Sequence, residues 1–155
     1  LSESKRKAIA QELQILAKQH HIAYHIVEKT ATQIDSQGLS ACLKSALTEI
    51  TTYFSSQTHT FIFDGNTTFG LTLKAPQTLQ TLIKGDSKHL LIGAASILAK
   101  MAKDTQMHQL HEQDPHYNLA SNKGYGTKAH IQAISQYGYM PFHRRSFAIT
   151  PTLKL

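Results

Sequence analysis

Two aspartates follow apolar segments and stand beside glycine, which makes them the first candidates for chemistry. Asp64 ends the Phe-Ile-Phe run of residues 61–63, and Asp86 follows Gly85 directly after the segment 79–84. Carboxylates at strand ends can converge above a sheet, and Mg²⁺ and Mn²⁺ prefer oxygen ligands. Two such ions about 4 Å apart can activate water for phosphodiester hydrolysis, although two carboxylates alone do not hold both. We expect a divalent-cation site here, with a simple turn at each glycine as the alternative.

Two further segments carry residue types suited to nucleic acid, and Asp104 is a third candidate aspartate. In residues 123–127, Lys-Gly-Tyr-Gly-Thr, an aromatic ring between glycines precedes a helix start, which suits stacking on a base or sugar; an ordinary loop is the alternative. Residues 143–147, His-Arg-Arg-Ser-Phe, can bind phosphate through arginine, or be a solvated tail. Asp104 lies in a helical run, where a surface charge paired with Lys100 is the alternative to a functional role.

The histidines and the single cysteine do not indicate a zinc site. Among ten histidines only His108 and His111, with Asp114 nearby, approach a ligand pair, and this signal is weak. Cys42 stands alone, so it forms no internal disulfide, and a reducing, cytoplasmic location is expected. No apolar run approaches the roughly 20 residues that span a bilayer, so we expect no membrane association.

Composition favours a basic single domain. The 155 residues contain 16 Lys and Arg against 10 Asp and Glu, a formal net charge of +6, with a sequence pI near 9.5. A basic surface of this kind suits a polyanion such as nucleic acid, although many proteins are basic for solubility alone. The length suits one core, and we predict one domain over residues 1–155.

Hydrophobic periodicity predicts alternating helices and strands. The expected helices cover about residues 2–20, 39–54, 88–113 and 127–137. The expected strands cover residues 21–28, 59–63 (ending at Asp64) and 79–84, with a weaker extended segment at 69–73 and a polar break at 30–38. This order predicts an α/β fold with helices on a sheet. About three strands against four helices leave the sheet incomplete.

Taken together and in order, these segments resemble the bacterial ribonuclease HII family. The matching motifs are Asp64-Gly65-Asn66, residues 84–88 (Lys-Gly-Asp-Ser-Lys), residues 94–100 (Ala-Ala-Ser-Ile-Leu-Ala-Lys) with Asp104 after them, residues 123–127 and residues 143–147. The resemblance implies a ribonuclease H-like mixed sheet flanked by helices. It also implies a monomeric endonuclease that hydrolyses the RNA strand of RNA–DNA hybrids, including 5′ to single ribonucleotides in duplex DNA, by two-metal activation of water with Mn²⁺ or Mg²⁺.

Carried over residue by residue, the resemblance assigns roles to nine positions. Asp64 and Asp86 match the third and fourth members of the family's Asp-Glu-Asp-Asp metal-binding and catalytic set. Tyr125 matches the ring that contacts the nucleotide at the RNA–DNA junction. Asp104 matches an acidic residue that supports the site. The remaining assignments are substrate-binding residues near phosphate: Lys123, Ser96, Lys100, Arg144 and Arg145.

The sequence departs from the family pattern in several places. The family's N-terminal Asp-Glu pair, Gly-Arg-Gly motif and Asp-Ser-Lys-Lys motif do not occur in these 155 residues, and residues 1–3 correspond to the positions just after the last of them. Asn122 replaces a common histidine and Gly93 a usual alanine. We therefore expect little hydrolysis by this chain alone. A non-catalytic nucleic-acid-binding protein and a fragment unable to fold are the alternatives.

Overall fold

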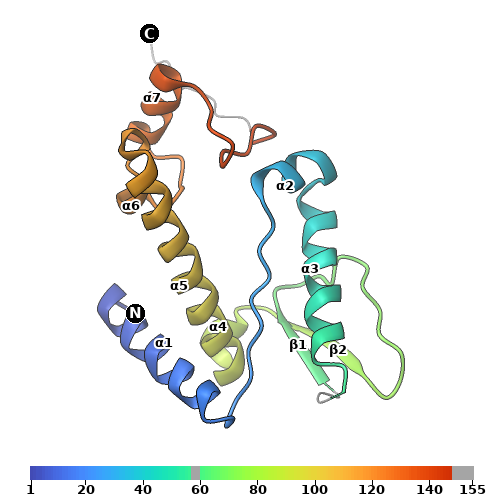
Figure 1. The fold of residues 1–155 in the computed structure, drawn as a ribbon. Coiled ribbons are helices and arrows are strands. Elements are labelled where there is room, and N and C mark those ends of the chain that lie inside the picture. Colours follow the sequence, from blue (N-terminus) through green and yellow to red (C-terminus); the bar gives the residue numbers. More distant parts are fainter. Residues whose placement is uncertain (57–59, 148–155) are drawn as a thin grey trace. The chain divides into compact units, whose positions relative to one another are not determined.

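The computed structural model describes residues 1–56 and 60–147, which divide into two compact units (Figure 1). The first unit comprises residues 1–29 and 37–101. The second unit comprises residues 30–36 and 102–155, and its residues 148–155 lie outside the part of the chain that the structure describes. One domain over residues 1–155 stays a prediction. The elements in chain order are α1 (Glu3–Lys18), α2 (Ala31–Gln37), α3 (Leu39–Tyr53), β1 (Thr60–Asp64), β2 (Thr78–Leu82), α4 (Gly85–Lys88), α5 (Leu90–Gln113), the 3₁₀ turn η1 (Pro115–Tyr117), α6 (Leu119–Asn122) and α7 (Lys128–Tyr137).

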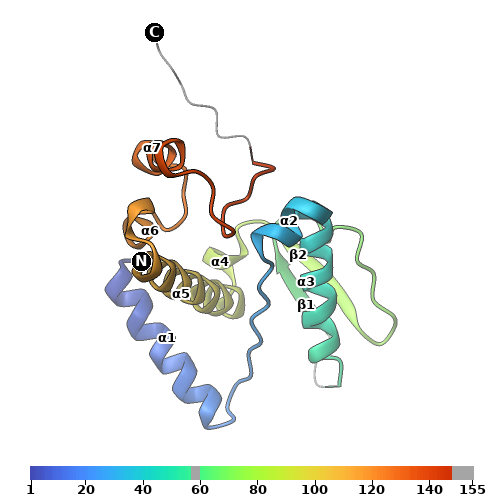
Figure 2. The same ribbon diagram turned by 45° about the horizontal axis from the view of Figure 1, so that its top comes forward.

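The sheet of the first unit consists of β1 and β2, which pair in parallel. Their register runs from Thr60 opposite Thr78 to Asp64 opposite Leu82. Threonine, leucine and phenylalanine fit a pleated, half-buried surface, which is why these segments form strands. The α3 helix lies over one face of the pair in both views (Figures 1 and 2). Both strands were predicted, except that the start of the first, at His59, falls outside the described residues.

The fold class is confirmed as α/β with an incomplete sheet. The strand predicted at residues 21–28 is nevertheless wrong, and the weaker extended segment predicted at 69–73 begins with a turn at residues 69 and 70. Residues 21–28 and 69–73 form no strand, although the first has an alternating pattern. A strand is made by hydrogen bonds to a neighbouring strand as well as by its own side-chain pattern, and neither segment has such a neighbour in the described parts of the chain.

The predicted polar break at residues 30–38 is also wrong, because α2 occupies most of it. Thr30 caps this helix: its hydroxyl accepts from the Gln33 backbone amide at 3.2 Å, while the Gln33 side chain accepts from the Thr30 amide at 2.9 Å. This reciprocal pair is a capping box, and Thr-x-x-Gln is its sequence signature. The signal was therefore present at residues 30–33 but was outweighed by polarity.

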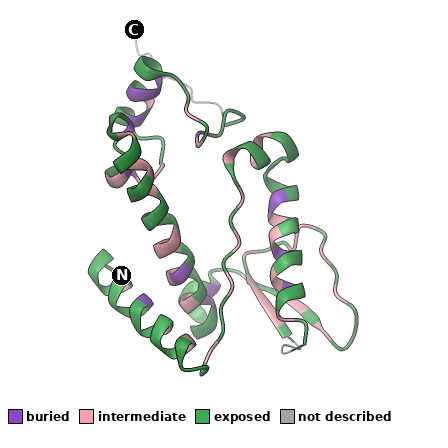
Figure 3. Cartoon of the chain, viewed as in Figure 1, coloured by how far each residue is buried: buried purple, intermediate pink, exposed green. Residues whose placement is uncertain are grey.

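The predicted N-terminal helix is confirmed as α1. Ser2 caps it by accepting from the Lys5 amide at 3.4 Å, and Lys18 lies in its last turn, where a cation suits the helix dipole. Ala10 is its one buried residue, and the helix is almost wholly exposed in Figure 3. Every helix within residues 1–56 and 60–147 is too short or too polar to cross a membrane.

The second unit has a small aromatic core. Tyr117 and Leu119 are each 1% exposed and pack with Ala133 and Ile134 of α7. The Tyr117 hydroxyl donates to the Gly138 carbonyl at 2.9 Å, which ties η1 to the end of α7. Four partly buried side chains pack around this core: Met107, Leu110, Met140 and Phe142.

Candidate active site

Asp64 and Asp86 lie at the same edge of the sheet. Asp64 is the last residue of β1, and its parallel partner Leu82 is the last residue of β2. The Gly85 amide donates to Asp64 Oδ1 at 2.8 Å, and Gly85 immediately precedes Asp86. Because parallel strands end at one edge, the backbone brings both acidic residues to the carboxyl end of the sheet. A divalent-cation site at this edge stays a prediction.

A tight turn makes this approach possible. Lys84 adopts a left-handed conformation with φ of 56° between β2 and α4. Gly85 is buried, and a Cβ there would lie 2.6 Å from Cδ1 of the buried Ile92 and 3.4 Å from Asp64 Oδ1. A side chain at position 85 would therefore displace the residue that binds Asp64.

Gly93 is a second glycine whose backbone lies close to this edge of the sheet. A Cβ on Gly93 of α5 would lie 2.9 Å from the backbone carbonyl oxygen of Asp86. The glycine at position 93 therefore lets α5 approach α4 closely.

The donor set at this edge fits a hard divalent cation. Asp64 and Asp86 are both exposed carboxylates, and one hydrogen bond from Gly85 leaves Asp64 with further lone pairs for a cation. Among residues 1–56 and 60–147, no group of three or more His, Cys, Asp or Glu is arranged to hold a metal ion. Two carboxylates supply only part of the coordination shell that Mg²⁺ or Mn²⁺ requires.

The predicted residues on α5 lie in different surroundings. Ser96 is exposed and Lys100 is half-buried, both within the first unit. Asp104 belongs to the second unit and is only 3% exposed. The alternative interpretation of Asp104 as a solvated surface charge is therefore wrong.

The predicted tyrosine loop of the second unit, residues 123–127, is held by a buried asparagine. The Asn122 side chain donates to the Tyr117 carbonyl at 2.7 Å and accepts from the Gly124 amide at 2.8 Å. Lys123 and Gly124 have positive φ angles of 53° and 77°, so the chain turns sharply before Tyr125. No local sequence pattern predicts this structural role of Asn122.

The Tyr125 ring is largely exposed and has a cation nearby. It is 59% exposed, and Lys103 Nζ lies 4.5 Å from the ring centroid. Lys123 Nζ contacts His108 Nε2 at 2.8 Å, so His108, weighed as a metal ligand, instead lies beside a lysine. Cations beside an exposed aromatic ring suit a stacked nucleotide with its phosphate. Lys103 was missed because a lone lysine in a helix carries no signal.

The basic segment of residues 143–147 is anchored by Asp35 of α2. Asp35 accepts from the Arg145 amide at 2.8 Å, the Ser146 amide at 3.0 Å and the Ser146 hydroxyl at 2.5 Å. These hydrogen bonds, led by those from Ser146, hold the pKa of the Asp35 carboxyl below its usual value. Arg144 lies over the Phe147 ring, with its guanidinium carbon 4.0 Å from the centroid. The arginines are exposed but their backbone is tied down.

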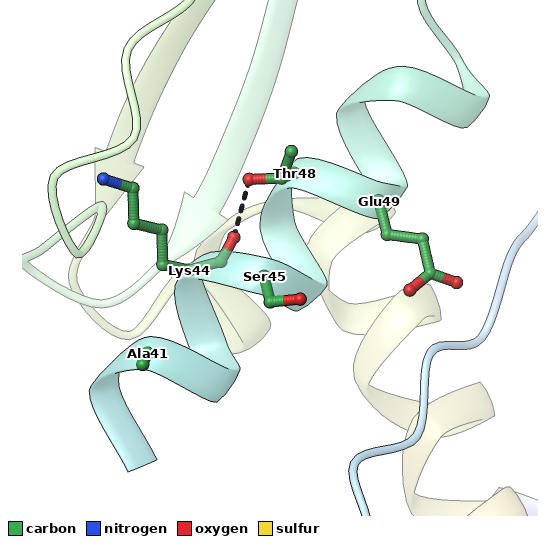
Figure 4. Close-up of a pocket in the computed structure, with 5 residues that line it drawn as sticks. All are labelled: Ala41, Lys44, Ser45, Thr48 and Glu49. Carbon is green, nitrogen blue, oxygen red and sulfur yellow. Dashed lines mark hydrogen bonds between the residues drawn. The ribbon is translucent and has the colours of Figure 1, made fainter. Parts of the chain in front are cut away.

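A shallow surface depression lies along α3 of the first unit. Figure 4 shows its five lining residues, Ala41, Lys44, Ser45, Thr48 and Glu49, all from that one helix. The Thr48 hydroxyl donates to the Lys44 carbonyl at 2.9 Å, which is a contact internal to the helix. Glu49 pairs with Lys29 and His25, whose side-chain nitrogens each lie 3.4 Å from its carboxylate, so the acidic group that lines the depression is already partnered.

The fold and this edge of the sheet define a class of protein. An α/β chain with acidic residues at the carboxyl ends of parallel strands is suited to binding a hard divalent cation. The chemistry open to such a site includes hydrolysis of phosphodiesters.

Comparison with known proteins places the chain within a family. The family model for ribonuclease HII matches residues 1–150. Relatives named ribonuclease HII include one from Helicobacter pylori (strain G27), 48% identical over 128 residues, which are 83% of this chain and 62% of the relative. The ribonuclease HII of Aliarcobacter butzleri (strain RM4018) is 42% identical to this chain, and that of Campylobacter jejuni subsp. doylei (strain ATCC BAA-1458 / RM4099 / 269.97) is 40% identical. Each of these two matches extends over 149 residues, which are 96% of this chain and 72% of the relative's own length.

The chain belongs to the ribonuclease HII family. The relatives carry the name of an enzyme, a ribonuclease, which confirms the resemblance drawn from the motifs. The chain spans 62% of the length of the Helicobacter pylori relative.

Proposed function

We propose that this chain is part of an endonuclease that hydrolyses the RNA strand of RNA–DNA hybrids, including 5′ to single ribonucleotides embedded in duplex DNA. The observation that carries the proposal is the hydrogen bond from Gly85 to Asp64 at 2.8 Å, which brings the residue next to Asp86 against the end of β1. Family membership supports the reaction class. We also propose that the protein is cytoplasmic and monomeric.

Asp64 and Asp86 would hold Mg²⁺ or Mn²⁺ as two of its ligands. A bound pair of such ions supplies an activated water and stabilises the leaving oxygen of the cleaved phosphodiester. The role of this chain's own residues is to place two carboxylates at one edge and to keep Asp64 oriented through Gly85. The remaining acidic ligands come from outside these 155 residues.

The substrate-binding residues are proposed from the second unit and from α5. Tyr125 offers an exposed ring on which a nucleotide can stack, with Lys103 and Lys123 close to the loop. Arg144 and Arg145 are exposed and their backbone is held by Asp35, so they suit contact with phosphate. Ser96 and Lys100 are assigned to phosphate by the family resemblance, and Asp104 to support of the site.

Cation binding by the chain tests the metal-site part of the proposal. We expect Mn²⁺ titration to show weak binding that is lost in Asp64→Asn and in Asp86→Asn. Glu12→Gln is the matched control, because Glu12 is an exposed carboxylate on α1 in the same unit. Equal Mn²⁺ binding by Asp64→Asn and the unaltered chain would contradict the assignment of this edge.

Substrate preference tests the nuclease assignment. Fluorescence anisotropy with a DNA duplex containing one ribonucleotide, compared with the all-DNA duplex, is expected to show tighter binding to the former. A gel assay with Mn²⁺ is expected to show little or no cleavage by the 155 residues alone, because they hold two of the four family carboxylates. Robust cleavage would show this last expectation to be wrong.

A non-catalytic nucleic-acid-binding protein is the second candidate function. The exposed Tyr125 and the anchored basic segment, residues 143–147, would serve it equally well. Such a protein has no need of Asp64 or Asp86, so its binding would be the same with Mn²⁺ and with a chelator. Metal-dependent preference for the ribonucleotide duplex therefore separates the two functions.

A further inference from the structure

Two buried histidines of the second unit share a hydrogen bond. His130 lies on α7 and His143 begins the basic segment, and they are 5% and 8% exposed. Their Nε2 atoms are 3.0 Å apart. Buried imidazoles in such contact must share one proton between the facing nitrogens, since two N–H groups would repel each other.

The outer partners of the pair determine its protonation. The Met140 amide can only donate, and it lies 2.9 Å from His143 Nδ1, so that nitrogen carries no proton. The Tyr125 carbonyl can only accept, and it lies 2.9 Å from His130 Nδ1, so that nitrogen is protonated. Two neutral rings then require His143 Nε2–H to donate to His130 Nε2.

This chain of hydrogen bonds joins the two segments assigned to substrate. At one end, the Tyr125 carbonyl also accepts from the Thr127 amide at 2.8 Å, so the His130 contact acts on the turn that presents the tyrosine ring. At the other end, His143 directly precedes Arg144. Neither histidine is exposed enough to contact a duplex itself.

We propose that His130 and His143 are positioning residues which, as a neutral pair, lock the tyrosine loop to the basic segment and thereby set their spacing for nucleic acid. This inference rests on the proposed function, which assigns those two segments to substrate. One additional proton on the neutral pair leaves either the Nε2–Nε2 contact or an outer contact without an acceptor. Acid therefore uncouples the loop from the segment.

The surroundings favour the neutral form. Burial lowers the pKa of His143 and a charge on His130 would lower it further, while the Met140 hydrogen bond and then Asp114 act in the opposite direction. Tyr117 of η1 faces both rings, with centroids 4.8 Å from His143 and 6.3 Å from His130, and burial raises its pKa. The other titratable or charged groups nearby are Tyr139, whose ring lies 5.9 Å from that of His143, Arg144 next to it in the chain, and His116, which is bonded to Asp114.

The test compares the unaltered chain with His143→Gln. Glutamine can donate from its amide nitrogen to neutral His130 and, after rotation, accept from protonated His130, so the variant tolerates the additional proton. The affinity ratio of the two proteins for the ribonucleotide duplex cancels the effect of the other histidines, whose protonation strengthens phosphate binding. We expect the affinity of the unaltered chain, divided by that of His143→Gln, to fall about tenfold from about pH 7.5 to about pH 5.5. A change of this size corresponds to the loss of one or two hydrogen bonds.

A control and an opposite outcome complete the binding test. His21→Gln removes an exposed histidine of the first unit, and its affinity ratio to the unaltered chain is expected to change less than about twofold over the same pH range. A His143→Gln ratio that stays constant with pH would mean that His143 is merely structural and overturns the proposal.

A second measurement reads the pair without any substrate. Imidazole ¹⁵N chemical shifts near pH 7.5 are expected to show the proton on Nδ1 of His130 and on Nε2 of His143. The Thr127 amide is expected to exchange faster once the pair is protonated in the unaltered chain. If these signatures are observed but the chain binds no nucleic acid, the proposed function is wrong while the assignment of the histidine pair stands. If the opposite tautomers are observed, the inference is overturned whatever the chain binds.

Discussion

The acidic edge of the first unit and the tyrosine loop of the second are built in different ways. At the edge, backbone shape places the carboxylates: a left-handed Lys84, a buried Gly85 and one amide hydrogen bond to Asp64. In the loop, buried side chains hold the backbone: Asn122 bonds to it on one side and His130 on the other. The edge should therefore fail when atoms are added, and the loop when polar atoms are removed.

The largest expected effect is at the edge. Gly85→Ala would bring a methyl group to 2.6 Å from Ile92 Cδ1 and is expected to lower the free energy of unfolding by about 3 kcal/mol, as overpacking does. Urea denaturation measures it. Gly126→Ala is the matched control, since nothing lies within 4 Å of its Cβ position, and it should cost little. Equal stability of the two variants would contradict the importance of the turn.

The next effect concerns the loop. Asn122→Ala removes a donor to the Tyr117 carbonyl and an acceptor for the Gly124 amide, and is expected to cost about 2 kcal/mol because buried polar groups lose their partners. Unfolding measurements give the cost, and amide exchange at Gly124 shows where it arises. Unchanged exchange there would indicate that the loop is held by something other than Asn122.

A smaller effect distinguishes packing from helix propensity. Alanine in a helix interior is favoured over glycine by about 1 kcal/mol, yet a Cβ at Gly93 would lie 2.9 Å from the Asp86 carbonyl oxygen. We expect the close contact to cancel that gain, so that Gly93→Ala is neutral or destabilising and weakens Mn²⁺ binding. If urea denaturation shows that Gly93→Ala is more stable by the whole of the helix-propensity difference, then α4 moves away from the added methyl group at little cost.

The smallest effect appears only in acid. Because the pKa of Asp35 is lowered from 3.8, its anchoring of Arg145 and Ser146 is fully present above that value and is lost as the pH falls through the lowered pKa. The difference in urea midpoint between the unaltered chain and Asp35→Asn should therefore shrink between about pH 5 and about pH 3. A difference that is the same at both values would mean that the carboxylate charge is unimportant.

Much of the acidic edge could be predicted from the sequence because its signals are local. A β-branched and aromatic run ending in Asp64 and Gly65 marks a strand and its turn, and Gly85 before Asp86 marks the second. The strand predicted at residues 21–28 was wrong, since alternation describes a segment's faces and leaves the choice of partner open. The capping box at residues 30–33 was readable and was missed.

The sequence by itself determined the family, the helices with strong periodicity and the order of the motifs. Only the tertiary structure selected His130 and His143 from ten histidines, and Asp35 as the anchor of a segment 110 residues away. The physical reason is that hydrogen bonds between distant side chains depend on packing, which brings together residues that share no periodicity or spacing. Those contacts hold the proposed substrate-binding segments in place.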